Sequence, residues 1–313
     1  MRRDCFLFLL AVLLASGPGV RPVRGAVAPT AAMFRGEVTV VETGGLSLQE
    51  CAADAWSRIG AGSGGGSFFT AWAFPVCEAL HSCRRHGAGA ERGPLAIRAR
   101  EGRIVVNPEH DRGLNLSDGP GATEPQLHWG VLLFLHQVDG GCCRIRDVKL
   151  LAPDRECDLG GGRLFWLGTA DEARGLEFIR GLLRPEGGRD LRKRLVFVLY
   201  MFSGSRAVSD LIGLARRDPD PAVRKDAIFW LGQKASQAAV RTLGEVIASP
   251  ESLEIKKQAI FALSQMDEDK GTPLLLDIAR KNPHPALRKQ AIFWLGQSGD
   301  PRALDFFESI LLH

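Results

Sequence analysis

The C-terminal half of the chain repeats one pattern of apolar and polar residues at a fixed step of 32. The segment Ile228–Gly232 recurs 64 residues later as Ile292–Gly296, and Ile260–Ser264 lies midway. Two further steps towards the N-terminus give Val196–Tyr200 and Leu164–Gly168. Five copies in one register predict a repeat protein, because neighbouring copies can bury a stripe that one copy cannot bury alone.

Each copy of the pattern predicts two helices. The first helix carries apolar residues at positions i, i+4, i+5 and i+8, as in Val223, Ala227, Ile228 and Leu231. The second carries them at i, i+3 and i+7, and both spacings place the residues on one helical face. Proline follows a polar residue at several helix starts, which is typical of a first helical turn. We therefore expect five helical hairpins stacked into an α/α-solenoid over residues 158–313.

Residues 26–157 show a different pattern. Apolar and polar residues alternate in Leu95–Val106 around a Glu-Gly pair, which predicts a β-hairpin. Leu127–Val138 and Arg144–Leu151 predict a second pair of strands around Asp-Gly-Gly, and Leu46–Ile59 predicts a helix. We expect a small, mixed, mainly antiparallel β domain.

The first 25 residues resemble a secretory signal peptide. Arg2 and Arg3 precede an apolar run, Phe6–Ala15, that is shorter than the roughly 20 residues a bilayer span requires. A retained membrane anchor is the alternative. We expect residues 1–25 to be removed from an exported, periplasmic or secreted protein that has no later membrane span.

Removing this segment changes the charge balance. The whole chain has 40 basic and 36 acidic residues, a formal net charge of +4. Residues 1–25 hold four arginines and one aspartate, net +3, so +4 − 3 leaves +1 for the rest. This near-neutral balance argues against general nucleic-acid binding, which needs many cations for phosphate. The hydrophobic fraction of 45% excludes wholesale disorder.

Six cysteines follow the signal segment, and all of them precede the repeats. An even count in an exported protein predicts disulfides, with fifteen pairings open. The candidates are Cys51, Cys77, Cys83, Cys142, Cys143 and Cys157.

A metal site is the alternative for part of this set. Cys77, His81, Cys83 and His86 cluster, but their spacing matches no standard zinc framework. We expect no bound metal and no cofactor. Motifs for a nucleophile or a phosphate loop are missing, and His136 is expected to lie on a strand as a surface or core residue.

The repeats resemble HEAT repeats, specifically the short HEAT-like repeats named after phycobilisome lyases. The resemblance lies in Asp218–Arg224 with Ala227 and Leu231, and in the equivalent residues through Leu295. The stretch Lys289–Ser298 also looks like that of exported bacterial HEAT-repeat proteins. This resemblance implies a solenoid, and similar repeats occur in scaffolds, in bilin lyases and in an iron-dependent hydroxylase of modified lysine.

The residues argue against the two enzymes. The hydroxylase needs His-Glu pairs in the first helices, and the chain has no His-Glu pair. Cationic side chains occupy those positions and cannot ligate iron. A bilin lyase needs a tetrapyrrole pocket, which no sequence feature identifies, and export would separate the protein from cytosolic substrates.

Eight cations recur at the same step along the first helices. They are Arg192, Lys193, Arg224, Lys225, Lys256, Lys257, Arg288 and Lys289. One interpretation is a groove that binds an acidic protein partner. The other is a structural ladder in which the arginines pair with turn aspartates such as Asp218 and Asp220.

Two apolar features allow similar alternatives. Trp166, Trp230 and Trp294 share one register, either as a half-buried flank of the helices or as a ligand-stacking strip. The last helix ends in Ile310 and Leu311 without a polar capping repeat, which suggests either a covering partner or self-association with a second copy. We therefore expect a non-enzymatic scaffold that binds another protein. The alternatives are an enzyme with its site in the N-terminal domain, near residues 72–136, or a bilin-lyase-like protein.

Overall fold

The computed structural model describes residues 21–22, 28–41, 46–59, 66–77, 95–101, 103–106, 126–139, 142–151, 156–184 and 188–312. The chain divides into two compact units, residues 1–178 (unit 1) and 179–313 (unit 2). The boundary therefore lies inside a helix, about 20 residues after the expected boundary at 157/158.

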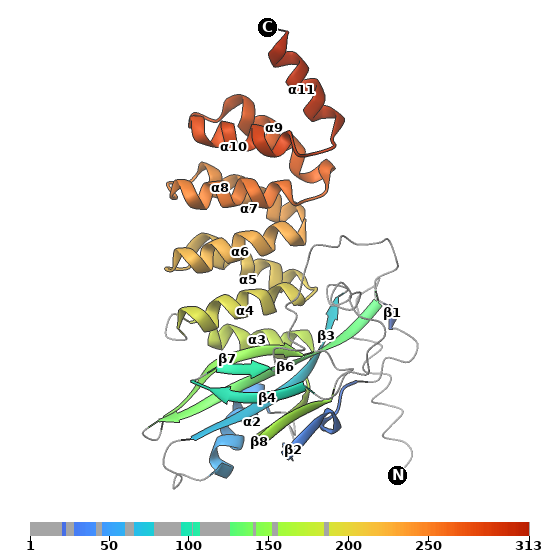
Figure 1. Ribbon diagram of the computed structural model, residues 1–313, viewed down its shortest axis with the longest axis vertical. Helices are drawn as coiled ribbons and strands as arrows, with labels where there is room; N and C mark the ends of the chain where they lie inside the picture. The colour runs from blue at the N-terminus through green and yellow to red at the C-terminus, as the bar shows by residue number, and fades with distance from the viewer. Residues whose placement is uncertain are drawn as a thin grey trace. The chain divides into compact units, whose positions relative to one another are not determined.

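Unit 1 is built on an eight-stranded sheet (Figure 1). Its elements are β1 (Arg21–Pro22), η1 (Ala31–Met33), β2 (Phe34–Val40), α2 (Leu48–Ile59), β3 (Gly66–Cys77), β4 (Leu95–Arg100), β5 (Arg103–Val106), β6 (Gln126–Asp139), β7 (Cys142–Leu151) and β8 (Cys157–Thr169). The strand order is β1-β6-β3-β8-β4-β5, with β2 paired to β8 and β7 paired to β6. β1 belongs to the segment predicted as a signal peptide, whose residues 1–20 lie outside the described part.

The expected hairpins β4–β5 and β6–β7 are both present and antiparallel. The sheet as a whole is not mainly antiparallel, because β2, β3 and β4 all run parallel to β8. Parallel partners come from distant parts of the chain, so alternation within one segment could not reveal them.

Both faces of the central strands are buried. Phe69, Ala71 and Ala73 of β3 point into one apolar core. Trp72 points to the other face, where its ring centroid lies 6.1 Å from that of Phe178 in α3 (Glu172–Leu182). Burial on two faces explains the nearly continuous apolar run of β3.

The first helix of the first predicted repeat copy is wrong, whereas its second helix is present as α3. Leu164–Gly168 lies in β8, between β2 and β3, instead of forming a helix. All four apolar residues of this segment are buried, as in a strand that is covered on both faces. A short continuous apolar run fits a buried strand or a helix equally well, and periodicity could not separate the two.

The other four copies form the expected helical hairpins, so four complete hairpins are present instead of the predicted five. They comprise α4 (Arg189–Met201), α5 (Ser205–Arg217), α6 (Pro221–Lys234), α7 (Gln237–Ala248), α8 (Leu253–Ser264), α9 (Glu268–Lys281), α10 (Pro285–Leu295) and α11 (Pro301–Leu311). Within unit 2 the hairpins stack one on the next (Figure 1). The side chains of Asp220, Ser252 and Asp300 cap their helices, and proline follows Asp220 and Asp300 at the helix start as expected.

The structure does not support the expected disulfides. Cys51, Cys142 and Cys143 are thiols, and Cys157 is buried at the start of β8. In the ladder with β6, Cys142 faces Asp139 and Cys143 faces Val138, so neither lies opposite a cysteine. The Cys77 side chain, Cys83, His81 and His86 lie outside the described residues.

Among the described residues, no helix combines the length and the apolar composition that a membrane span requires. In the same part of the chain, no three His, Cys, Asp or Glu side chains gather in a group that could hold a metal ion.

Candidate protein-binding surface

The arginines of the predicted ladder are structural. Arg192 donates from Nη1 to both carboxylate oxygens of Asp218 at 2.7 Å, and it is only 5% exposed. Arg224 donates to the main-chain oxygen of Asp218 at 2.7 Å, and Arg288 donates to that of Asn282 at 2.8 Å. Each of these last two arginines therefore holds the turn before its own helix.

Arg192 is consequently not available to a partner, which corrects that part of the predicted groove. A buried arginine–carboxylate pair is strongly coupled because neither charge is solvated alone. Lys256 takes the equivalent position in α8 and is half-buried.

The lysines form a second, more exposed column. Lys193 lies 3.5 Å from Asp226, and Lys257 lies 3.4 Å from Glu254 on its own helix. Such surface pairs are weak and can be exchanged for contacts with a partner. Within the described residues, Lys225 and Lys289 make no ion pair, and Lys289 is exposed. The predicted ladder thus separates into a column of arginines that hold turns and a column of lysines that range from partly exposed to exposed.

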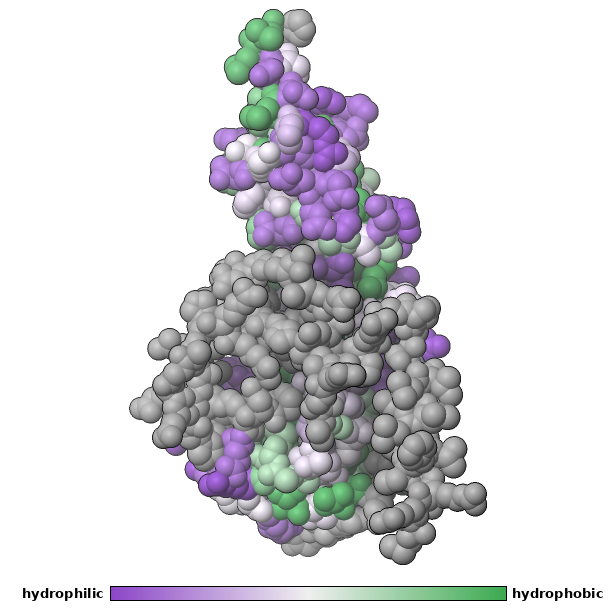
Figure 2. Space-filling view, turned by 90° about the vertical axis from the view of Figure 1, so that its right-hand side faces the viewer, coloured by the Kyte–Doolittle hydropathy of each residue, from purple (hydrophilic) through white to green (hydrophobic). Residues whose placement is uncertain are grey.

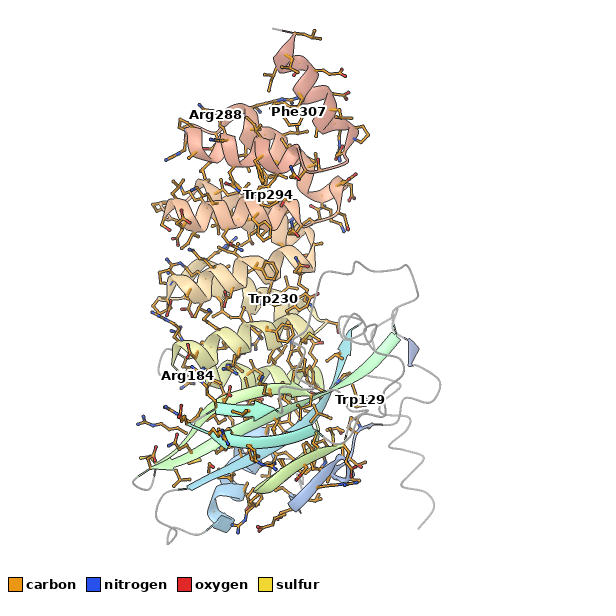
Figure 3. The ribbon with its side chains drawn as sticks, viewed as in Figure 1. Trp129, Arg184, Trp230, Arg288, Trp294 and Phe307 are labelled. Carbon is orange, nitrogen blue, oxygen red and sulfur yellow. The ribbon has the colours of Figure 1, made fainter. Side chains whose placement is uncertain are left out.

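A continuous row of aromatic rings runs beside the lysines, and we name it the aromatic strip. Its members come from α4, α6, α8 and α10, and they are Phe197, Tyr200, Phe229, Trp230, Phe261, Phe293 and Trp294. Figure 3 labels Trp230 and Trp294 within it. Neighbouring helices are joined by centroid distances of 4.9 Å for Phe197–Trp230, 6.2 Å for Phe229–Phe261 and 5.1 Å for Phe261–Trp294.

Trp166 does not belong to this strip. It is buried in β8 of unit 1, where its ring centroid lies 6.1 Å from that of Phe34. The shared register of the three tryptophans therefore holds for Trp230 and Trp294 only.

The lysines and the aromatic strip share one side of each helix. Every lysine of the column precedes a phenylalanine by four residues, as Lys225 precedes Phe229 and Lys257 precedes Phe261. Residues four apart are neighbours on a helix surface. This pairing was not predicted, although the recurrence of phenylalanine at the 32-residue step was a visible signal.

Unit 1 contains a buried Cys-His-Thr row that could suggest catalysis. His136 Nε2 lies 2.8 Å from the Thr70 hydroxyl, and its Nδ1 lies 3.6 Å from the Cys143 sulfur. The His136 ring also stacks on Phe68 at a centroid distance of 4.5 Å. The position of His136 on a strand was predicted, but its partners were not.

The protonation of this row does not favour a nucleophile. Burial lowers the pKa of His136 to about 3, and burial raises the pKa of the Cys143 thiol. A reactive cysteine needs the thiolate, which a cationic imidazole would stabilise. Here both groups are neutral at pH 7 and His136 is 4% exposed, so the row is a polar contact inside the core.

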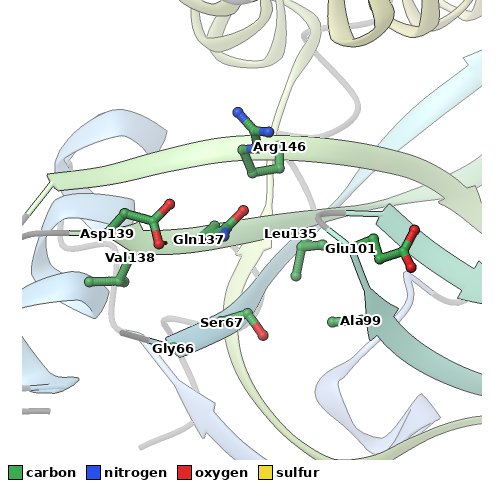
Figure 4. A pocket seen from close by; sticks show the side chains of 9 residues that line it. All are labelled: Gly66, Ser67, Ala99, Glu101, Leu135, Gln137, Val138, Asp139 and Arg146. Atoms are coloured by element: carbon green, nitrogen blue, oxygen red, sulfur yellow. Dashed lines mark hydrogen bonds between the residues drawn. The ribbon is translucent and has the colours of Figure 1, made fainter. Parts of the chain in front are cut away.

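A pocket of about 450 Å³ opens between β3, β6, β7 and the β4–β5 turn (Figure 4). Its polar lining comes from Ser67, Glu101, Gln137, Asp139 and Arg146. Its size is within the range of small-molecule sites. Ala99, Glu101 and Leu135 of this lining belong to residues 72–136, the region predicted for an enzyme site. The described lining includes no histidine, cysteine or tryptophan, and Trp72 is fully buried.

One comparison with known proteins agrees with the fold of unit 2. A family model described as HEAT repeats matches residues 208–283 and 251–313, which confirms the expected repeat type over that region. No curated protein matches the chain.

Two solved structures are similar over part of the chain. Human deoxyhypusine hydroxylase in complex with glycerol is 22% identical with a TM-score of 0.33, over 43% of this chain and 43% of that chain. The complex of CpcE and CpcF of phycocyanin lyase from Nostoc is 22% identical with a TM-score of 0.32, over 41% of this chain and 82% of that chain. The chain thus spans less than half of the hydroxylase, and we transfer no activity from either protein.

Proposed function

We propose that this protein is a non-enzymatic scaffold whose HEAT-repeat unit binds another protein through the first helices. The observation that carries the proposal is the lysine column beside the aromatic strip, repeated on α4, α6, α8 and α10. Aromatic rings are common anchors in protein interfaces, and lysines at the rim select partners by charge. The favoured partner segment carries acidic and apolar side chains.

The repetition supports a protein partner more than a small ligand. The strip continues over the first helices of four successive hairpins, so contacts with it extend along the stack. Solenoids use such extended faces for recognition because each repeat adds the same surface again. We further propose that the protein is exported, which rests on the sequence of residues 1–25.

The alternatives have narrower support. An enzyme in unit 1 has the pocket of Figure 4 as its one favourable observation, and the neutral Cys143–His136 contact argues against a cysteine nucleophile. A bilin-lyase-like role rests on the resemblance of the repeats alone.

The test compares two charge-reversal variants as bait in affinity capture from envelope extract. The first is Lys225→Glu with Lys257→Glu, on the lysine column. The matched control is Arg206→Glu with Arg241→Glu, two exposed arginines on the second helices. Both variants change the net charge equally.

We expect at least one protein to bind the unaltered chain and the control variant but not the lysine variant. Its association should also slow as ionic strength rises, because rim charges act on the encounter rate. Identical binding by all three baits would refute the proposed surface.

A further inference from the structure

The last two described helices expose apolar residues, and three of these occupy positions that are buried in the two preceding repeats. Ile292 of α10 is 36% exposed, whereas its equivalents Ile228 in α6 and Ile260 in α8 are fully buried. Phe293, the next residue, is 54% exposed. The same residue type at the same register position thus has a different environment at this end of unit 2.

The contrast is larger on α11. Ile310 and Leu311 are 52% and 84% exposed. Their equivalents in α7, Val246 and Ile247, are 3% and 5% exposed, and the equivalent pair in α9 is buried as well. We name the exposed set the terminal patch, and it comprises Ile292, Phe293, Leu304, Ile310, Leu311 and Leu312. Figure 2 shows its α11 residues as a hydrophobic cluster at the end of the unit.

The stacking rule of unit 2 explains why the patch is exposed. Helix α6 packs against α4 and α5, α8 packs against α6 and α7, and α10 packs against α8 and α9. Each first helix therefore covers both helices of the hairpin before it. No described helix packs on α10 and α11 in this way. The faces of these two helices that are covered in the earlier hairpins are therefore exposed.

The charges beside the patch are opposite on its two helices. Lys289 precedes Ile292 by three residues on α10, and α10 contains no acidic residue. Glu308 precedes Leu311 by three residues on α11. Residues at this spacing lie on one helix face. Both charged residues are exposed, so each is free to meet an opposite charge on another molecule.

We propose that the terminal patch binds the same patch of a second copy of this chain, with α10 of each copy lying on α11 of the other. A two-fold axis makes every contact occur twice, so Lys289 meets Glu308 of the second copy in two places. The apolar residues of α10 then cover those of α11, as a first helix covers a second helix within the stack. This contact does not depend on the proposed partner-binding function, but it covers Lys289 and Phe293 of α10, so a partner then binds the lysines and rings of α4, α6 and α8.

The test is the mass of the full chain by sedimentation equilibrium at several concentrations. We expect twice the single-chain mass for the unaltered protein and the single-chain mass for Leu311→Glu. The control Gln237→Glu lies on an exposed position of α7 and should leave the dimer intact. Circular dichroism checks that each variant retains its helices.

Swapping the charges of Lys289 and Glu308 tests whether α10 of one copy lies on α11 of the other. Lys289→Glu and Glu308→Lys should each weaken dimerisation about tenfold, because two symmetry-related pairs become repulsive. The double variant should restore it. A single-chain mass for the unaltered protein at every concentration would overturn the proposal, and so would a double variant no better than the single ones.

Discussion

The buried imidazole of His136 makes the stability of unit 1 depend on pH in a predictable direction. Burial lowers its pKa from the usual 6.5 to about 3. The unfolded chain therefore binds a proton below pH 6.5 that the folded chain does not bind until about pH 3. Stability is highest above pH 6.5 and falls as the pH decreases through this window.

The size of the effect follows from the two pKa values. One pH unit within the window changes the free energy of unfolding by about 1.4 kcal/mol for one proton. Between pH 7.5 and pH 5.0 the loss is about 2 kcal/mol, because only the 1.5 units below 6.5 contribute. At pH 5.0 the folded imidazole is still neutral, because its pKa of about 3 lies well below that pH.

The measurement compares the unaltered chain with His136→Gln, which cannot titrate. Urea-dependent hydrogen exchange of β6 amides reports the opening of unit 1 separately from unit 2. The unaltered chain should lose about 2 kcal/mol more than the variant between pH 7.5 and pH 5.0. Contributions from carboxylates are common to both proteins and cancel in the comparison.

Thr70→Val serves as the control for the hydrogen bond at Nε2. It removes the partner of His136 but keeps the titrating ring, so it should retain the extra loss at low pH. Equal pH dependence of the unaltered chain and His136→Gln would refute the argument.

Two predictions concern unit 2, and both are checked by urea unfolding followed by circular dichroism. Arg192→Ala should lower the free energy of unfolding by about 3 to 5 kcal/mol, because it leaves Asp218 buried without its cation. A decrease of less than about 1 kcal/mol would contradict this burial penalty. Gly232→Ala should destabilise by about 1 to 3 kcal/mol, since its new Cβ would lie 2.7 Å from the carbonyl oxygen of Ala262. Gly213→Ala is the matched comparison, because a Cβ at Gly213 would meet no atom closer than 3.6 Å, and it should raise the free energy of unfolding by up to about 1 kcal/mol. If both glycine variants stabilised the protein, the close approach of α6 and α8 would be disproved.

The candidate surface was only partly predictable. The eight cations were visible as a periodic set, but their division into arginines that hold turns and lysines that are partly or fully exposed was not. Arg192 and Lys193 are adjacent in the sequence, yet one is buried against Asp218 and the other lies at the surface. Which side of a helix meets the next hairpin depends on how the hairpins pack.

The sequence by itself determined the four hairpins of unit 2 from α4 to α11, their register and several of their caps. This was possible because each repeat contacts mainly its neighbours in the chain, so local periodicity carries the packing information. Only the tertiary structure decided unit 1. There β8 takes its partners from β2 and β3, about 120 and 95 residues earlier, and these pairings turned an apolar run that fitted the repeat into a buried strand. The pKa of His136 was likewise decided by burial between distant strands, which no local pattern records.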